Sequence, residues 1–248
     1  ILSPNSGGLN QRKEVPAETD EPVIIDVMIV YTPAAETWAN RSGGGIRNVI
    51  NSAMAIAQQT VDNSELNLLF RLVHQRRVDY SETGNSTTDL RNMTNGVIPG
   101  VHSLRNEYGA DLVSMFTSTH DVGGIAWMQT SPIPQPYYGY SITRVQQAAN
   151  SATHVHEMGH NLGSAHSRNQ RSNAASASGG AFRYSTGWRW NGDDFRQYTS
   201  VMTYAEGGTR IEIFSNPDIS YMGEPTGSYN GTYAPADNAR SIRNMKHA

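Results

Sequence analysis

A group of histidines just past the middle of the chain has residue types and spacing that indicate chemistry. His156 and His160 are four positions apart, so on a helix both imidazoles project from one face toward one point. Glu157 could act on a metal-bound water without taking a coordination position. Gly163 permits a left-handed turn, which would bring His166 back as a third ligand. Three protein ligands leave a fourth position open, so the pattern predicts a catalytic zinc site.

A second segment, residues 200–204, contains Met202 and Tyr204. Together the two segments resemble the metzincin clan of zinc endopeptidases, in which a long zinc motif is followed by a methionine-containing "Met-turn". The resemblance implies that Met202 forms an apolar floor beneath the three histidines. It also implies an α/β (α+β) catalytic domain with a mixed twisted sheet, an active-site helix in an upper subdomain and a smaller, irregular lower subdomain.

Tyr204 has two interpretations. In the astacin and serralysin branches of the clan, a tyrosine at this offset can ligate zinc and can swing away to stabilise the transition-state oxyanion. The resemblance implies that role for Tyr204. The alternative is an ordinary aromatic side chain under the site, because other segments resemble the reprolysin-like branch, where this tyrosine is not generally expected. Both interpretations stay open.

Substrate contacts are expected on the segment that precedes the zinc helix. Gly124, Ile125 and Ala126 lie in a run that resembles the edge strand of reprolysins. In metzincins this strand borders the cleft and pairs with extended substrate, backbone to backbone. The alternative is a plain glycine-led strand or turn.

Specificity is expected to depend on the loop after the methionine, residues 205–210. This loop shapes the S1′ pocket in the clan. Arg210 could pair with an acidic P1′ side chain, a preference of the related peptidyl-Asp metalloendopeptidases. The alternative is a solvated loop arginine.

The apolar pattern predicts the elements that must position these groups. Helix 146–162 carries His156 and His160, with Val155, Met158 and Leu162 toward the core. A terminal helix should be capped by Asp237, in a region similar to the C-terminal ends of bacterial reprolysin-like proteases. Strands are expected at 23–31, 66–78, 111–116, 123–128 and 137–145, and further helices at 46–63, 89–95 and 100–108.

The chain divides, on this interpretation, into an N-terminal arm (1–20), an upper subdomain (21–163) and a lower subdomain (164–248). The arm begins without methionine and is polar, so we expect it to remain after maturation and removal of a propeptide. In the lower subdomain, Asp193 and Asp194 could bind a structural calcium ion or form a solvated turn. We expect a monomer.

Composition excludes several classes of function. The 248 residues include 22 acidic and 19 basic side chains, and this net charge of −3 favours neither nucleic acid nor an anionic membrane. No run approaches the roughly 18 apolar residues that span a bilayer. The absence of cysteine excludes disulfides, a Cys-based zinc site and a cysteine nucleophile. Because secreted animal relatives are usually disulfide-rich, a cysteine-free chain favours a secreted bacterial enzyme.

These observations predict a secreted zinc endopeptidase that hydrolyses internal bonds of extended polypeptides, with one catalytic zinc ion and Glu157 as general base. One alternative is a catalytically quiet zinc-binding adhesin or toxin-like module, although such a protein needs no base beside the metal. The other is a zinc amidase or esterase, although an open edge strand favours extended peptides.

Overall fold

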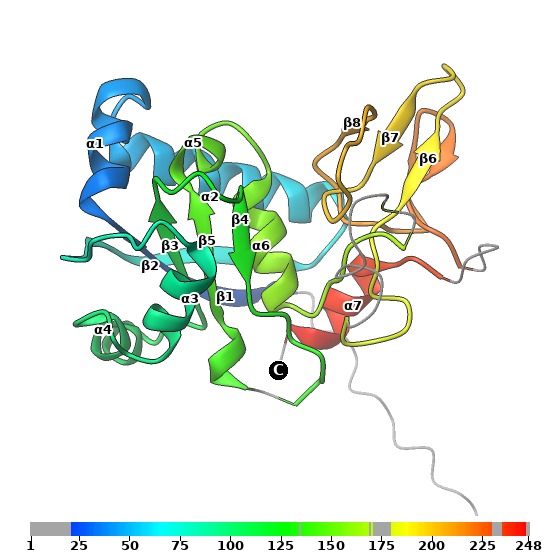
Figure 1. Ribbon diagram of the computed structural model, residues 1–248. Helices are drawn as coiled ribbons and strands as arrows, with labels where there is room; N and C mark the ends of the chain where they lie inside the picture. Colours follow the sequence, from blue (N-terminus) through cyan, green and yellow to red (C-terminus); the bar gives the residue numbers. More distant parts are fainter. Residues whose placement is uncertain (1–20, 134, 169, 171–179, 230–234, 247–248) are drawn as a thin grey trace, which may run out of the picture.

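The computed structural model describes residues 21–133, 135–168, 170, 180–229 and 235–246, and the expected arm over 1–20 lies outside them. Its main element is a five-stranded sheet in the order β2-β1-β3-β5-β4 (Figure 1). The strands are β1 (Val23–Tyr31), β2 (Leu68–Arg77), β3 (Leu112–Thr117), β4 (Gly124–Ala126) and β5 (Tyr140–Arg144). All neighbours pair in parallel except β4, which is antiparallel to β5. The expected mixed sheet is confirmed, and β4 forms one of its edges.

Both faces of the sheet are buried, as the near-continuous apolar run in β1 requires. Alternate residues of a strand point to opposite faces. Accordingly, Val27 and Ile29 join one apolar cluster, and Met28 and Val30 join another. The first cluster includes side chains of α1 (Pro33–Ser42), α2 (Ile46–Asn63), α5 (Val145–Ala148) and α6 (Thr153–Asn161), and the second those of α3 (Ser86–Thr94) and α4 (Val101–Tyr108).

Three local expectations differ from the structure. Helix α1 was not expected because it has few periodic apolar residues; Thr32 caps it by accepting a hydrogen bond from the Ala35 amide. The start of the strand expected at 137–145 forms a 3₁₀ helix, Pro136–Tyr138. The expected zinc helix is divided into α5 and α6. Between them the Ser151 hydroxyl bonds back to the Gln147 carbonyl, which offers the backbone an alternative to a continuous helix.

The chain after α6 forms short elements rather than only irregular loops. Strands β6 (Arg189–Asn191), β7 (Gln197–Thr199) and β8 (Thr209–Arg210) make a small sheet, and β9 (Ser220–Tyr221) pairs with β10 (Glu224–Pro225). Helix α7 (Asn238–Met245) is capped by Asp237, as expected, through the Arg240 amide. The division into two subdomains stays a prediction.

The small sheet lies on one side of α6 and the five-stranded sheet on the other (Figure 1). Met158 of α6 belongs to the same buried apolar cluster as Met202, Phe214 and Ile242 from the later part of the chain. Helix α6 is therefore packed from both sides. No helix among the described residues combines the length and the apolar character needed to cross a membrane.

Candidate active site

Helix α6 presents His156 and His160 on one face, and the chain returns His166 to them. The helix ends at Asn161, and Gly163 adopts φ 79°, the left-handed conformation expected of it. The Ser164 amide then bonds to the Gly159 carbonyl at 2.9 Å, which closes the turn. His166 follows directly, with its neighbour Ala165 held by a bridge to Thr186.

The three imidazoles converge through their Nε2 atoms. His166 Nε2 lies 2.9 Å from His156 Nε2 and 3.1 Å from His160 Nε2. Among the described residues, these three histidines are the only group of three or more His, Cys, Asp or Glu side chains whose ligand atoms come within metal-binding reach of one another.

Backbone carbonyls select the tautomer of two of these rings. His156 Nδ1 lies 2.8 Å from the Val201 carbonyl, and His160 Nδ1 lies 2.8 Å from the Ser164 carbonyl. Each Nδ1 must therefore donate, which leaves the Nε2 lone pair facing inward. Burial holds the pKa of His156 well below its usual value, and lowers those of His160 and His166 to about 4 and about 3. Neutral imidazoles with converging lone pairs fit Zn²⁺.

Glu157 stands beside this group, 4 % exposed. Burial raises the pKa of its carboxyl to about 8, while the charge of Arg210 acts in the opposite direction. The strand β4 passes so close that a Cβ at Gly124 would lie 2.4 Å from Glu157 Oε1. Glycine at position 124 is thus required for the edge strand to approach the carboxylate.

Met202 lies beneath the helix, in a turn closed by the Thr203 amide on the Ser200 carbonyl at 3.0 Å. Its side chain is fully buried. A Cβ at Gly159, between the two helical histidines, would meet Met202 Sδ at 2.7 Å. The methionine therefore lies against α6 directly under the histidines, and its role as a floor stays a prediction.

Tyr204 follows this turn with its ring beside the histidines. Its ring centroid is 4.9 Å from that of His166 and 6.2 Å from that of His156. Burial, and then the Glu157 charge, raise the pKa of its phenol. This placement is compatible with either interpretation of Tyr204.

Two adjoining hollows border the histidines. The first, about 280 Å³, is lined by the three histidines, Glu157, Tyr204 and all of β4. The second, about 560 Å³, shares Gly124, Glu157 and Tyr204 and extends to Arg210. The structure therefore brings together the predicted metal ligands, the predicted base, the edge strand and Arg210. Asp193 and Asp194 lie outside both hollows, where Asp194 accepts from the Arg196 amide and the Tyr198 hydroxyl, and calcium binding stays a prediction.

Sequence reasoning missed several residues that shape the site. Gln147 and Thr153 line the second hollow, and the Thr153 hydroxyl donates to Gln147 Oε1 at 2.8 Å. Asn161 donates through Nδ2 to the carbonyls of Trp127 and Tyr140, which fastens α6 to the strands beside it. No spacing rule identifies them: the partners of Asn161 lie more than twenty positions away, and Gln147 and Thr153 meet across the break between α5 and α6.

Comparisons with known proteins agree with this geometry. Residues 47–167 match the metallo-peptidase family M12B, reprolysin-like. The chain is 30 % identical over 249 aligned residues to a peptidyl-Asp metalloendopeptidase of Xanthomonas campestris, with 98 % of this chain and 54 % of the relative covered. It is 30 % identical to a peptidyl-Asp metalloendopeptidase of Pseudomonas aeruginosa, covering 90 % of this chain and 39 % of that protein. The chain thus spans about half or less of the length of these relatives.

A solved structure described as a chaperone-substrate complex has a similar fold, with a TM-score of 0.68 at 18 % identity, covering 92 % of this chain and 34 % of that one. This likeness concerns the fold alone. The sequence matches include the helix with the converging histidines, and we conclude that the chain carries a reprolysin-like metallopeptidase domain.

Proposed function

We propose that this chain is a zinc-dependent endopeptidase with Glu157 as its general base. The observation that carries the proposal is the convergence of three neutral imidazoles beside a buried carboxyl and an open sheet edge, all in one hollow. His156, His160 and His166 would hold the ion and leave one position for water or substrate.

The chemistry follows from what each side chain can do. A zinc ion held there would acidify a water molecule and polarise the carbonyl of the scissile bond. Glu157 accepts a proton from the attacking water and donates it to the leaving amine. Burial raises the pKa of Glu157 in the metal-free site, whereas the charge of a bound zinc ion would act in the opposite direction and favour the carboxylate that accepts the proton. We propose that the Tyr204 phenol, whose ring lies beside His166, donates to the developing oxyanion.

The free side of β4 supplies the binding site for an extended chain. Within the part of the chain that the structure describes, Gly124, Ile125 and Ala126 pair with β5 on one side only, and they line the first hollow. An unpaired strand edge binds peptide through main-chain hydrogen bonds, which tolerates many sequences. This geometry favours a polypeptide substrate over a small ester.

An acidic side chain is the best fit for the second hollow. Arg210 extends into it, and desolvation lowers the guanidinium pKa there. A partly desolvated arginine gains more from a bidentate carboxylate than a solvated one does. We identify this hollow as the S1′ pocket and propose a preference for Asp or Glu at P1′. The names of the relatives, peptidyl-Asp metalloendopeptidases, agree with an acidic preference.

We also propose that the enzyme is secreted and acts as a monomer after loss of a propeptide. The absence of cysteine and the low fraction of charged residues, 17 %, support secretion. Detection of the mature chain in culture medium of the producing cell, at the mass of a monomer, would test this part.

The decisive experiment is cleavage mapping by mass spectrometry on a denatured protein mixture. New termini that a chelator abolishes and zinc restores would establish the endopeptidase. Arg210→Met should lose the acidic P1′ preference, whereas Arg196→Met, at a side chain that is 79 % exposed, should keep it. Absence of cleavage by the zinc-loaded chain, with turnover of small esters, would favour the esterase; absence of both would favour the binding module.

A further inference from the structure

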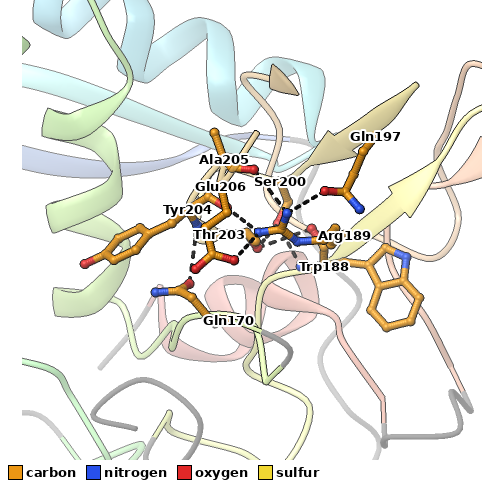
Figure 2. Close-up of polar contacts among 9 residues, drawn as sticks. All are labelled: Gln170, Trp188, Arg189, Gln197, Ser200, Thr203, Tyr204, Ala205 and Glu206. Atoms are coloured by element: carbon orange, nitrogen blue, oxygen red, sulfur yellow. Dashed lines mark hydrogen bonds and ion pairs between the residues drawn. The ribbon is translucent and has the colours of Figure 1, made fainter. Parts of the chain in front are cut away.

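Arg189 holds the backbone segment that follows the methionine turn (Figure 2). Its guanidinium donates to the carbonyls of Tyr204 at 2.6 Å and Ala205 at 3.1 Å. It also donates to Gln197 Oε1 at 2.6 Å and pairs with Glu206 Oε2 at 2.9 Å. Four acceptors therefore converge on one side chain, and three of them come from consecutive residues.

The ion pair is shielded from water and lies where the backbone is strained. The side chains of Arg189 and Glu206 are only 12 % and 16 % exposed. Glu206 adopts φ 45°, a left-handed conformation that a glutamate rarely takes without support. A desolvated pair contributes little net stability but constrains geometry strongly, because both charges need their partners. We expect this pair to fix the local path of the chain.

The side chain of Tyr204 depends on that path. Figure 2 shows its ring extending away from the guanidinium while its carbonyl meets Arg189. The ring lines the first hollow beside His166. The Tyr204 amide, which belongs to the preceding peptide group, donates to Gln170 Oε1 at a longer distance of 3.3 Å.

Arg210, the other functional side chain of this loop, has a different support. It belongs to β8, where residues pair with β7 in the register Thr199↔Arg210. A strand ladder would hold Arg210 even when the Arg189 contacts are lost. The position of the Tyr204 phenol therefore depends on the Arg189 contacts, whereas that of Arg210 depends on the pairing of β8 with β7.

We propose that Arg189 is a positioning residue, which holds the Tyr204–Glu206 backbone so that the Tyr204 phenol stays beside the histidines. The proposal rests on the role given to Tyr204 in the proposed function. It assigns Arg189 no contact with substrate or metal.

A double-mutant cycle tests the proposal. We expect Tyr204→Phe to lower kcat on the order of 100-fold, as for loss of an oxyanion donor. Arg189→Met should lower kcat about tenfold through misplacement of the phenol, with KM and the acidic P1′ preference nearly unchanged. In the Tyr204→Phe background, Arg189→Met should change kcat by less than about twofold. An equal loss in both backgrounds would overturn the proposal.

A matched control is Arg105→Met. Arg105 likewise donates to several carbonyls, those of Ala110, Asp111 and Pro136, but it lies outside both hollows. It should keep kcat per folded molecule. Two milder variants guard against misfolding of Arg189→Met: Arg189→Lys keeps the charge without the fork of donors, and Glu206→Gln keeps an acceptor without the charge. In both variants kcat should fall less than in Arg189→Met, and the loss should again nearly disappear in the Tyr204→Phe background.

Hydrogen exchange of the metal-free protein gives a readout independent of activity. Peptides covering residues 203–208 should exchange faster in Arg189→Met, while β1 should keep its protection. Unchanged exchange at 203–208 would overturn the proposal. If Tyr204→Phe keeps full kcat, the catalytic role of Tyr204 in the proposed function fails. Faster exchange at 203–208 in Arg189→Met would then still show that Arg189 holds this backbone segment.

Discussion

The regions before and after Gly163 hold their functional groups in different ways. In the first, β1 and α6 are packed by apolar side chains, and Glu157 and the two helical histidines project from a helix held by Val155 and Met158. In the second, buried Ser, Thr and Asn side chains connect the segments through directed hydrogen bonds. Close-packed apolar side chains resist changes in side-chain volume, whereas hydrogen bonds fix the orientation of the groups that they join. The third histidine and Tyr204 come from the hydrogen-bonded region.

Glu157→Gln is the substitution from which we expect the largest effect. It removes the base but keeps the shape of a side chain on the well-packed helix. Activity should fall at least about 1000-fold, because general acid–base catalysis contributes roughly 10²–10⁴-fold. Zinc content by atomic emission and thermal stability should stay near those of the parent chain. A variant with near-normal kcat/KM would remove Glu157 from the mechanism.

Ile29→Ala tests the apolar half of the comparison. Ile29 is fully buried in β1 and far along the chain from the histidines. Truncation should cost about 2–5 kcal/mol of unfolding free energy, from lost burial and the cavity left behind. Metal affinity and kcat per folded molecule should be unchanged. Urea unfolding and zinc titration measure the two quantities, and a loss of zinc affinity in the folded variant would contradict the separation of the regions.

The strength of apolar periodicity explains what the sequence could predict. The ranges 23–31 and 46–63 match β1 and α2 residue for residue, because both carry a strong apolar pattern. The histidine group was predictable because its ligands lie within eleven residues on one helix and turn. Helix α1 and the break before α6 were missed because caps and side-chain bonds to the backbone decide them. The contacts of Arg189 depend on tertiary structure, which no local pattern records.

His154 is an exception within the apolar region and makes stability depend on pH. Its ring is 1 % exposed, packs edge-on against Phe116, and both ring nitrogens lack a hydrogen-bond partner among the described residues. Burial lowers the pKa from 6.5 to about 4. Because the folded pKa lies below the unfolded one, the contribution is present above pH 6.5 and lost as pH falls through 4. The full loss approaches roughly 3 kcal/mol.

His154→Leu should therefore show a shallower decline of unfolding free energy between neutral and acidic pH. The measurement is urea unfolding of both proteins at about pH 7.5 and about pH 4.5. Chelator is present throughout, so that the metal-ligand histidines titrate alike in the two proteins and cancel in the difference. Equal declines would show that His154 binds its proton equally well in the folded and unfolded states.

Ser215→Ala should cost less stability than Ile29→Ala, and it tests the hydrogen-bonded half. The fully buried Ser215 hydroxyl donates to the Thr186 carbonyl at 2.7 Å and accepts from the Asn238 amide at 2.9 Å. Leaving these groups unpaired should cost about 1–3 kcal/mol. Ser103→Ala, at an exposed hydroxyl, is the control and should stay within about 0.5 kcal/mol.

The Ser215→Ala and Ile29→Ala variants should differ in their effects on zinc affinity and on the free energy of unfolding. Thr186 forms a bridge with Ala165, the neighbour of His166, so the Ser215 contact reaches the third ligand in three steps. We therefore expect Ser215→Ala to weaken zinc binding by roughly threefold to tenfold, less than the 10–100-fold loss usual for partners that contact the ligand directly. Ile29→Ala costs more stability and should leave zinc affinity unchanged. Should zinc affinity instead follow unfolding free energy across both variants, directed hydrogen bonds would have no special role in placing His166.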